Sequence, residues 1–112
     1  MNNKEIEKGK VHSLVEIIEY APDAIVSKTL LKKPTGIIDL ISYDTGKGLT
    51  GKIYPFDTFV LLIEGKAEVI IDGKINELNA FQGIIIPAHS AYIVNAIERF
   101  KMLSVTVKSG YE

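Results

Sequence analysis

Apolar residues along this chain recur in short runs, rich in isoleucine and valine and separated by glycine, proline or aspartate. Runs of this length between turn-forming residues are typical of β-strands. The pattern predicts strands at residues 25–31, 36–43, 58–63, 67–71, 74–78, 84–87, 91–95 and 101–107. Many short strands with almost no helical periodicity predict an all-β sandwich or barrel.

Two local patterns refine this outline. Asp72 and Gly73 lie between two predicted strands, and this pair suits the type I′ turn of a β-hairpin because that turn needs positive φ at both central positions. Residues 13–16 read Ser-Leu-Val-Glu, a capping-box pattern that predicts a short helix or turn. Residues 1–10 are mostly polar and are expected to be a flexible lead-in to a single domain over residues 1–112.

The predicted strand at residues 58–63 is apolar on both faces, whereas a strand with one face in water should alternate. Something must therefore cover its outer side. Either the N-terminal segment folds over it, or a second subunit packs against it sheet to sheet, and the two can occur together. We expect a homodimer assembled through residues 58–63, with exchange of residues 24–31 as a further element.

Composition narrows the classes of partner. Thirteen basic and fourteen acidic residues leave a net charge of -1, and without a basic stripe nucleic acid is not expected as a partner. The chain has no cysteine, which excludes disulfides, thiolate zinc sites and cysteine nucleophiles and fits a reducing cytoplasm. No stretch approaches the roughly 20 apolar residues of a membrane helix, so we expect a soluble, cytoplasmic protein without a membrane partner.

The segment from Gly46 to Gly65 resembles the first motif of the cupin family, which reads Gly, five residues, His-x-His, three or four residues, Glu, six residues and Gly. The segment around Pro87 resembles the second motif, and the hairpin at residues 63–74 is similar to the usual connection between the two. With further similarity at residues 26–30, 55–57 and 98–103, the chain resembles small single-domain, RmlC-like cupins over roughly residues 14–107. This resemblance implies a jelly-roll barrel, also called a double-stranded β-helix, with a short N-terminal helix or turn.

The positions at which the family holds its metal carry other residues here. Lys52 and Tyr54 stand at the two His positions of the first motif, Thr58 at its Glu, and Tyr92 at the His of the second motif. Such sites need neutral imidazoles and a carboxylate at about 2.0–2.2 Å from the ion, and an ammonium group repels it. We therefore expect no bound metal and no other cofactor, and metal-dependent dioxygenase chemistry is disfavoured.

The two histidines occupy different places relative to the motifs. His89 stands at the Gly of the Pro-x-Gly turn in the second motif, where positive φ is expected and where histidine is among the tolerated residues. We interpret it as a turn residue at the barrel mouth, while ligand contact or proton transfer stays open because an unperturbed histidine has a pKa of about 6.5. His12 lies outside both motifs and is expected to be exposed.

The polar residues at the former ligand positions are expected to line the barrel interior: Lys52, Tyr54, Thr58 and Tyr92, with His89 nearby. Period-two alternation puts the first three on one face if one strand continues through Pro55. This lining favours a metal-free protein that binds a small anionic or polyhydroxylated molecule.

Two other functions stay open at this point. One is a metal-independent isomerase, epimerase or similar enzyme that uses His89, Lys52 or a tyrosine as nucleophile or proton-transfer group. The other is a structural or regulatory dimer with a filled lumen, in which Lys52 pairs with Asp57 or Asp39 or extends toward the mouth.

Overall fold

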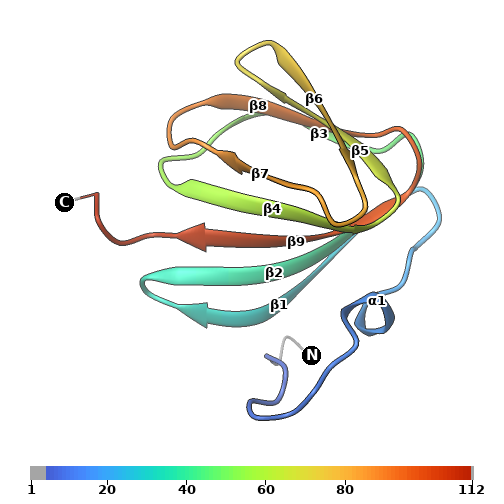
Figure 1. The fold of residues 1–112 in the computed structure, drawn as a ribbon, viewed down its shortest axis with the longest axis vertical. Helices are drawn as coiled ribbons and strands as arrows, with labels where there is room; N and C mark the ends of the chain where they lie inside the picture. The colour runs from blue at the N-terminus through green and yellow to red at the C-terminus, as the bar shows by residue number, and fades with distance from the viewer. Residues whose placement is uncertain (1–4, 112) are drawn as a thin grey trace.

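The computed structural model describes residues 5–111, with the side chains of residues 49–52 left undescribed. Two antiparallel sheets face each other (Figure 1): a large sheet in the order β1-β2-β9-β4-β7 and a small sheet in the order β3-β8-β5-β6. The all-β jelly-roll prediction is confirmed. In chain order the elements are α1 (Leu14–Ile17), β1 (Ile25–Lys33), β2 (Gly36–Tyr43), β3 (Gly48–Ile53), β4 (Asp57–Glu64), β5 (Lys66–Ile71), β6 (Lys74–Asn79), β7 (Gly83–Ile86), β8 (Ala91–Ala96) and β9 (Phe100–Val107).

Strand β3 is the element that the hydrophobic pattern did not predict. It contains two glycines and a lysine among six residues, so it lacks the apolar run by which the other strands were found. The chain leaves β3 after Ile53 and starts β4 at Asp57, and Pro55, which has no N–H to donate to a ladder, lies between them. The assumption of one strand through Pro55 is therefore wrong.

The turn at Asp72 and Gly73 is confirmed as predicted. Their φ angles are 49° and 83°, and Ile71 pairs directly with Lys74 across the two-residue loop. Both central positions thus have the positive φ that a type I′ turn needs.

The main core lies between the two sheets. Its largest fully buried pair is Tyr43 and Phe100, whose stacked rings have centroids 4.5 Å apart. Aliphatic side chains from both sheets pack around this pair and close that end of the interior: Val60, Leu62, Ala67, Val69, Leu78, Ile86, Val94, Ala96 and Met102.

A second core lies on the outer face of the large sheet, under the N-terminal segment (residues 5–23). Ile18 is buried there against Leu30, Leu40 and Ile63. Figure 1 shows this segment beside β1 and β2, on the side away from the small sheet. The N-terminal segment thus covers part of the outer side of β4, one of the two coverings expected from the sequence, although Phe59 remains 39% exposed.

Polar contacts attach the N-terminal segment to the sheet. The Tyr20 hydroxyl donates to Glu64 Oε2 at 2.6 Å, and Lys101 Nζ donates to the Val15 carbonyl at 2.5 Å. The Ile6 N–H donates to the Leu30 carbonyl at 3.2 Å, so this part of the expected lead-in contacts β1. These bonds satisfy groups such as the buried Lys101 ammonium, which would otherwise be costly to hold against a sheet.

Two expectations about the N-terminal segment are wrong. Ser13 makes no side-chain capping bond to α1; instead its backbone carbonyl accepts the N–H groups of Glu16 and Ile17, which is sufficient for a single helical turn. His12 is half-buried, because its ring packs beside the second core with Nε2 2.9 Å from the Glu7 carbonyl oxygen. Among the described residues, no helix has the length and hydrophobicity that crossing a membrane requires.

Candidate functional site

The inner face of the large sheet changes from apolar to polar along its strands. Alternation along β2 puts Asp39 on the same side as Tyr43, facing the small sheet. Its cross-strand partners are Thr29 on β1 and Ser104 on β9, and the Thr29 hydroxyl donates to Asp39 Oδ1 at 2.9 Å. A half-buried carboxylate with hydroxyls on both sides thus lies on the lumen wall.

One further row along the same wall, two threonines face each other. Thr58 pairs with Thr106 in register, and their hydroxyl oxygens are 3.4 Å apart. Both residues are buried. Each hydroxyl has two lone pairs and one proton, so this contact leaves capacity for a further hydrogen bond.

Three tyrosines, from the small sheet, the large sheet and the β3–β4 loop, lie close to one another at the interior. Tyr92 is half-buried and packs against the main core, and burial raises its pKa, with a further increase from neighbouring Tyr54. Burial, together with nearby Tyr92, raises the pKa of Tyr43 to about 12. Tyr43 and Tyr92 are thus close enough to influence each other, as are Tyr92 and Tyr54, and the raised pKa values of Tyr43 and Tyr92 keep these two hydroxyls neutral over the physiological pH range.

The residues at the former motif positions are only partly brought together. Tyr54 lies in the loop between β3 and β4, half-buried and edge-to-face with Phe56 at 5.4 Å, whereas Thr58 lies on β4. The backbone of Lys52 pairs with Tyr92 on β8, but its side chain lies outside the described part. The predicted roles of Lys52, as ligand contact or as partner of an aspartate, stay predictions.

His89 occupies a turn with a φ of 67°, as expected from its place in the second motif, and its side chain is exposed. Its N–H donates to the Tyr54 carbonyl at 2.7 Å, so it is held beside the β3–β4 loop. Asp57 is close: its Oδ1 accepts the Ala88 N–H at 2.8 Å, which lowers the pKa of this carboxyl, as do the Tyr111 hydroxyl and, to a smaller degree, His89.

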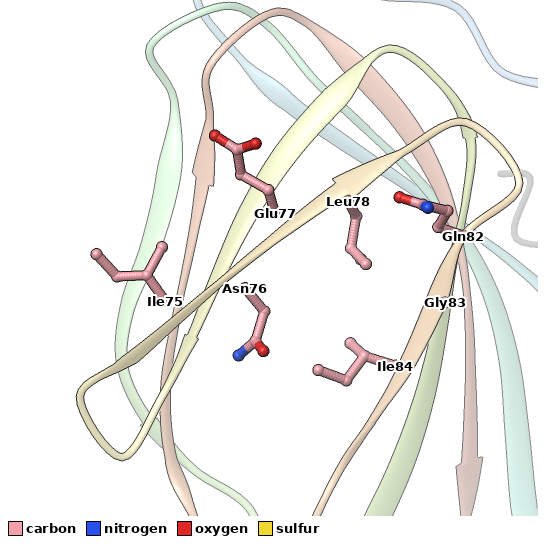
Figure 2. A pocket seen from close by; sticks show the side chains of 7 residues that line it. All are labelled: Ile75, Asn76, Glu77, Leu78, Gln82, Gly83 and Ile84. Carbon is pink, nitrogen blue, oxygen red and sulfur yellow. The ribbon is translucent and has the colours of Figure 1, made fainter.

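A groove opens the interior sideways, between the free edges of β6 and β7. Its volume is about 610 Å³. Figure 2 shows Asn76, Leu78 and Ile84 directed into this space, whereas Glu77 and Ile75 point to the other side of β6. Tyr54, Thr58 and Tyr92 do not line this groove.

The site does not fit a transition metal. Within the described residues, no three His, Cys, Asp or Glu side chains are close enough to share an ion. Tyr54, Thr58 and Tyr92 offer hydroxyls instead, and the raised pKa of Tyr92 opposes the phenolate that a metal would need.

Three residues of the lumen wall were not identified from the sequence as site residues: Tyr43, Ser104 and Asp39. Asp39 was named there only as a possible partner of Lys52. A signal for two of them was present, since period-two alternation along residues 36–43 puts Asp39 on the same face as Tyr43. No comparable signal marked Ser104, because each face of β9 carries both apolar and polar residues.

Comparisons with known proteins were made by sequence and by structure. No protein-family model and no curated protein matches the chain. A conserved protein of unknown function from Streptococcus pyogenes matches with a TM-score of 0.89 and 31% identity, over 96% of this chain and 94% of that one. A cupin superfamily protein from Desulfitobacterium hafniense matches with a TM-score of 0.86 and 25% identity, over 96% and 98%.

A third match covers only part of its partner. It is a cupin 2 conserved barrel domain protein from Leptotrichia buccalis, with a TM-score of 0.81 and 32% identity over 84% of this chain. This chain spans 46% of that protein's length, whereas it spans nearly all of the other two.

Proposed function

The chain belongs to the cupin superfamily, and we propose that it is a metal-free binding protein for a polyhydroxylated small molecule. The observation that carries this proposal is the polar row on the lumen wall, in which Asp39 lies between Thr29 and Ser104. The absence of cysteine is consistent with the cytoplasm as its location.

The chemistry of the wall favours hydroxyl groups over an anionic group. Serine, threonine and tyrosine hydroxyls both donate and accept, which matches the hydroxyls of a polyol, and a carboxylate accepts two bonds from a diol. Neither of the two ion pairs among the described side chains involves Asp39, so its charge would repel an anion. In the adjoining row of the same face, half-buried Ile41 offers an apolar contact to the C–H face of a sugar ring.

The test compares a neutral polyol with the sugar acid of the same carbon skeleton. Melting temperature and calorimetry should show saturable binding of the polyol. Asp39→Asn should weaken binding about tenfold or more, because a hydrogen bond to a charged group contributes about 1.5–3 kcal/mol. Glu16→Gln, the same chemical change at an exposed helix position, is the control and should bind like wild type.

Other outcomes would redirect the proposal. Preferential binding of the sugar acid, lost in Lys52→Ala, would establish an anion site. If neither compound binds at millimolar concentration, the hypothesis that remains is the structural or regulatory dimer with a filled lumen.

Metal content is tested separately, by elemental analysis of untagged protein before and after incubation with Mn, Fe, Ni, Cu and Zn and desalting. The expected result is less than a tenth of an equivalent of each ion. A near-stoichiometric ion that is lost in His89→Ala would contradict the metal-free proposal.

A metal-independent isomerase or epimerase is a second candidate, favoured by the effect of His89 on the pKa of Asp57 at the barrel mouth. Such an enzyme moves a proton from carbon, for which a histidine close to a carboxylate is suited. Incubating carbonyl sugars with the protein in D₂O and following deuterium incorporation by NMR tests this. Incorporation that disappears in His89→Gln would favour the enzyme, and no incorporation would remove it.

A further inference from the structure

Strands β6 and β7 each have one free edge, because β6 ends the small sheet and β7 ends the large sheet. The groove of about 610 Å³ lies between these two edges. Figure 2 shows the side chains of Asn76, Leu78 and Ile84 pointing into it. An unpaired strand edge beside a groove that can accept side chains is the feature by which a sheet takes up an extended peptide as an additional strand.

The backbone of β6 presents a regular set of hydrogen-bonding groups at its free edge. Ile71 and Lys74 flank the two-residue loop and therefore form a hydrogen-bonded pair. Because the two kinds of pair alternate along an antiparallel ladder, Ile75 and Glu77 belong to non-hydrogen-bonded pairs with β5. Their N–H and C=O groups consequently point away from β5, toward the free edge. No loop or turn in the described part of the chain bonds to these four groups.

The edge of β7 is less suited to an added strand. Strand β7 has four residues, whereas β6 has six. Gly83 begins β7 and has no side chain to pack against a neighbour, and Pro87 directly follows β7 and has no N–H to donate. The longer and more regular edge is therefore that of β6, and β7 forms the opposite wall of the groove.

The outer face of β6 indicates the charge of the strand that it fits. Glu77 is exposed there and lies directly opposite Glu68 on β5, an arrangement in which like charges repel. Neither of the two ion pairs among the described side chains involves these glutamates. Asn95 Nδ2 donates to Glu68 Oε1 at 3.4 Å, whereas no described side chain bonds to Glu77. A basic residue across the free edge from Glu77 would supply the missing positive charge.

We propose that the free edge of β6 binds an extended, basic segment of a partner protein as a fifth, antiparallel strand of the small sheet. An arginine or lysine of the segment lies opposite Glu77. The next side chain enters the groove beside Asn76 and Ile84. The one after it is apolar and lies opposite Ile75, which is 61% exposed. The segment recognised therefore reads basic, apolar, apolar.

This edge is separate from the proposed polyol site. None of the lumen-wall residues Thr29, Asp39 and Ser104 lines the groove. Binding of a peptide at β6 and binding of a polyol in the lumen can therefore succeed or fail independently.

The first test uses the blocked synthetic peptide Thr-Val-Arg-Val-Ile-Thr and follows binding by calorimetry. Wild type should bind it with a dissociation constant of about 100 µM or lower. Glu77→Lys should weaken binding at least about fivefold, and a peptide with glutamate in place of arginine should prefer this variant to wild type. Glu16→Lys, the same change at an exposed helix position, is the matched control and should bind like wild type.

Two N-methylated peptides distinguish strand addition from binding through side chains alone. Methylation of the arginine and isoleucine nitrogens removes the N–H groups that face β6, and it should weaken binding at least about tenfold. Methylation of the two valine nitrogens, whose N–H groups face away from β6, should have a much smaller effect. Equal losses for the two peptides would overturn strand addition.

Amide hydrogen exchange, followed by NMR, locates the added strand. Saturating peptide should slow exchange of the Ile75 and Glu77 N–H groups at least about tenfold and leave those of Gly83 and Ile85 unchanged. Protection at β7 alone would overturn the choice of β6. No binding at about 1 mM peptide would overturn the proposal. So would protection of β6 that rises with protein concentration in the absence of peptide, which would assign the edge to a second copy of this chain.

Discussion

Two glycines with the same backbone conformation differ in their surroundings. Gly65 and Gly73 have φ angles of 90° and 83°. A Cβ on Gly65 would lie 2.7 Å from the Phe100 Cα and against the Arg99 carbonyl, whereas a Cβ on Gly73 would meet nothing within 4 Å. In the β4–β5 turn, both the positive φ and the lack of space require glycine at position 65. In the β5–β6 hairpin, only the positive φ favours glycine at position 73.

Gly65→Ala should lower the free energy of unfolding by about 3 kcal/mol or more, the sum of backbone strain and overpacking. Gly73→Ala, with the strain alone, should cost about 1 kcal/mol. Urea denaturation of both variants measures the difference, and equal losses would contradict the close approach of Phe100.

Tyr43 should make the free energy of unfolding depend on pH in the alkaline range. Its pKa is raised to about 12 by burial, against about 10 in the unfolded chain. The unfolded chain therefore loses this proton first. Between about pH 10 and 12 this residue's contribution to stability should fall as pH rises, by about 1.4 kcal/mol per pH unit. Tyr43→Phe should show a correspondingly flatter dependence in urea titrations across this range. A variant as pH-sensitive as wild type would show that Tyr43 is not responsible.

Among single residues, the turn positions were predictable and the wall residues less so. His89 was expected to have positive φ because the Pro-x-Gly pattern demands it locally, and it does. The role of Asp39 in the lumen wall depends on Thr29 and Ser104, which lie on two other strands and are distant from it in the sequence.

At the level of elements, the N-terminal segment acts as the cover of the large sheet. Its short helix has no side-chain cap and four residues, so it has little stability of its own. Packing of Ile18 against the sheet and the bonds of Tyr20 and Lys101 hold it in place. Tertiary contacts, rather than helix propensity, therefore stabilise this segment.

Ile18→Ala should cost about 2–4 kcal/mol, because it leaves a cavity between the segment and Leu40. Val11→Ala, at a side chain that is 96% exposed, should change stability by less than about 0.5 kcal/mol. Chemical denaturation at neutral pH measures both. A small loss for Ile18→Ala would mean that the segment contributes little to the fold.

The expected strands were found because each has a dense apolar run, with ends that differ by one or two residues from the prediction. Strand β3 was missed because it is held by pairing with β8 rather than by its own composition. The capping box failed because the Glu16 N–H, which the Ser13 hydroxyl would accept in such a box, donates to the Ser13 carbonyl instead.

At the scale of the whole molecule, the homodimer expected from the sequence should couple stability to concentration. The melting temperature of wild type should rise with protein concentration between about 5 and 500 µM, because association stabilises only folded chains. That of Phe59→Glu, a change in the strand expected at the interface, should stay constant. Scanning calorimetry at matched concentrations checks this, and a wild-type curve independent of concentration would argue against dimerisation.

The sequence by itself determined the strand content, the hairpin at Asp72 and Gly73, the jelly-roll resemblance and the loss of metal ligands, since all of these depend on local pattern or motif spacing. Only the tertiary structure decided which residues share the lumen wall, how far the N-terminal segment covers the large sheet, and which apolar row is left uncovered. The physical reason is register. Pairing between strands distant in the chain brings Thr29, Asp39 and Ser104 together on one face and aligns Ile38, Val105 and Phe59 on the other.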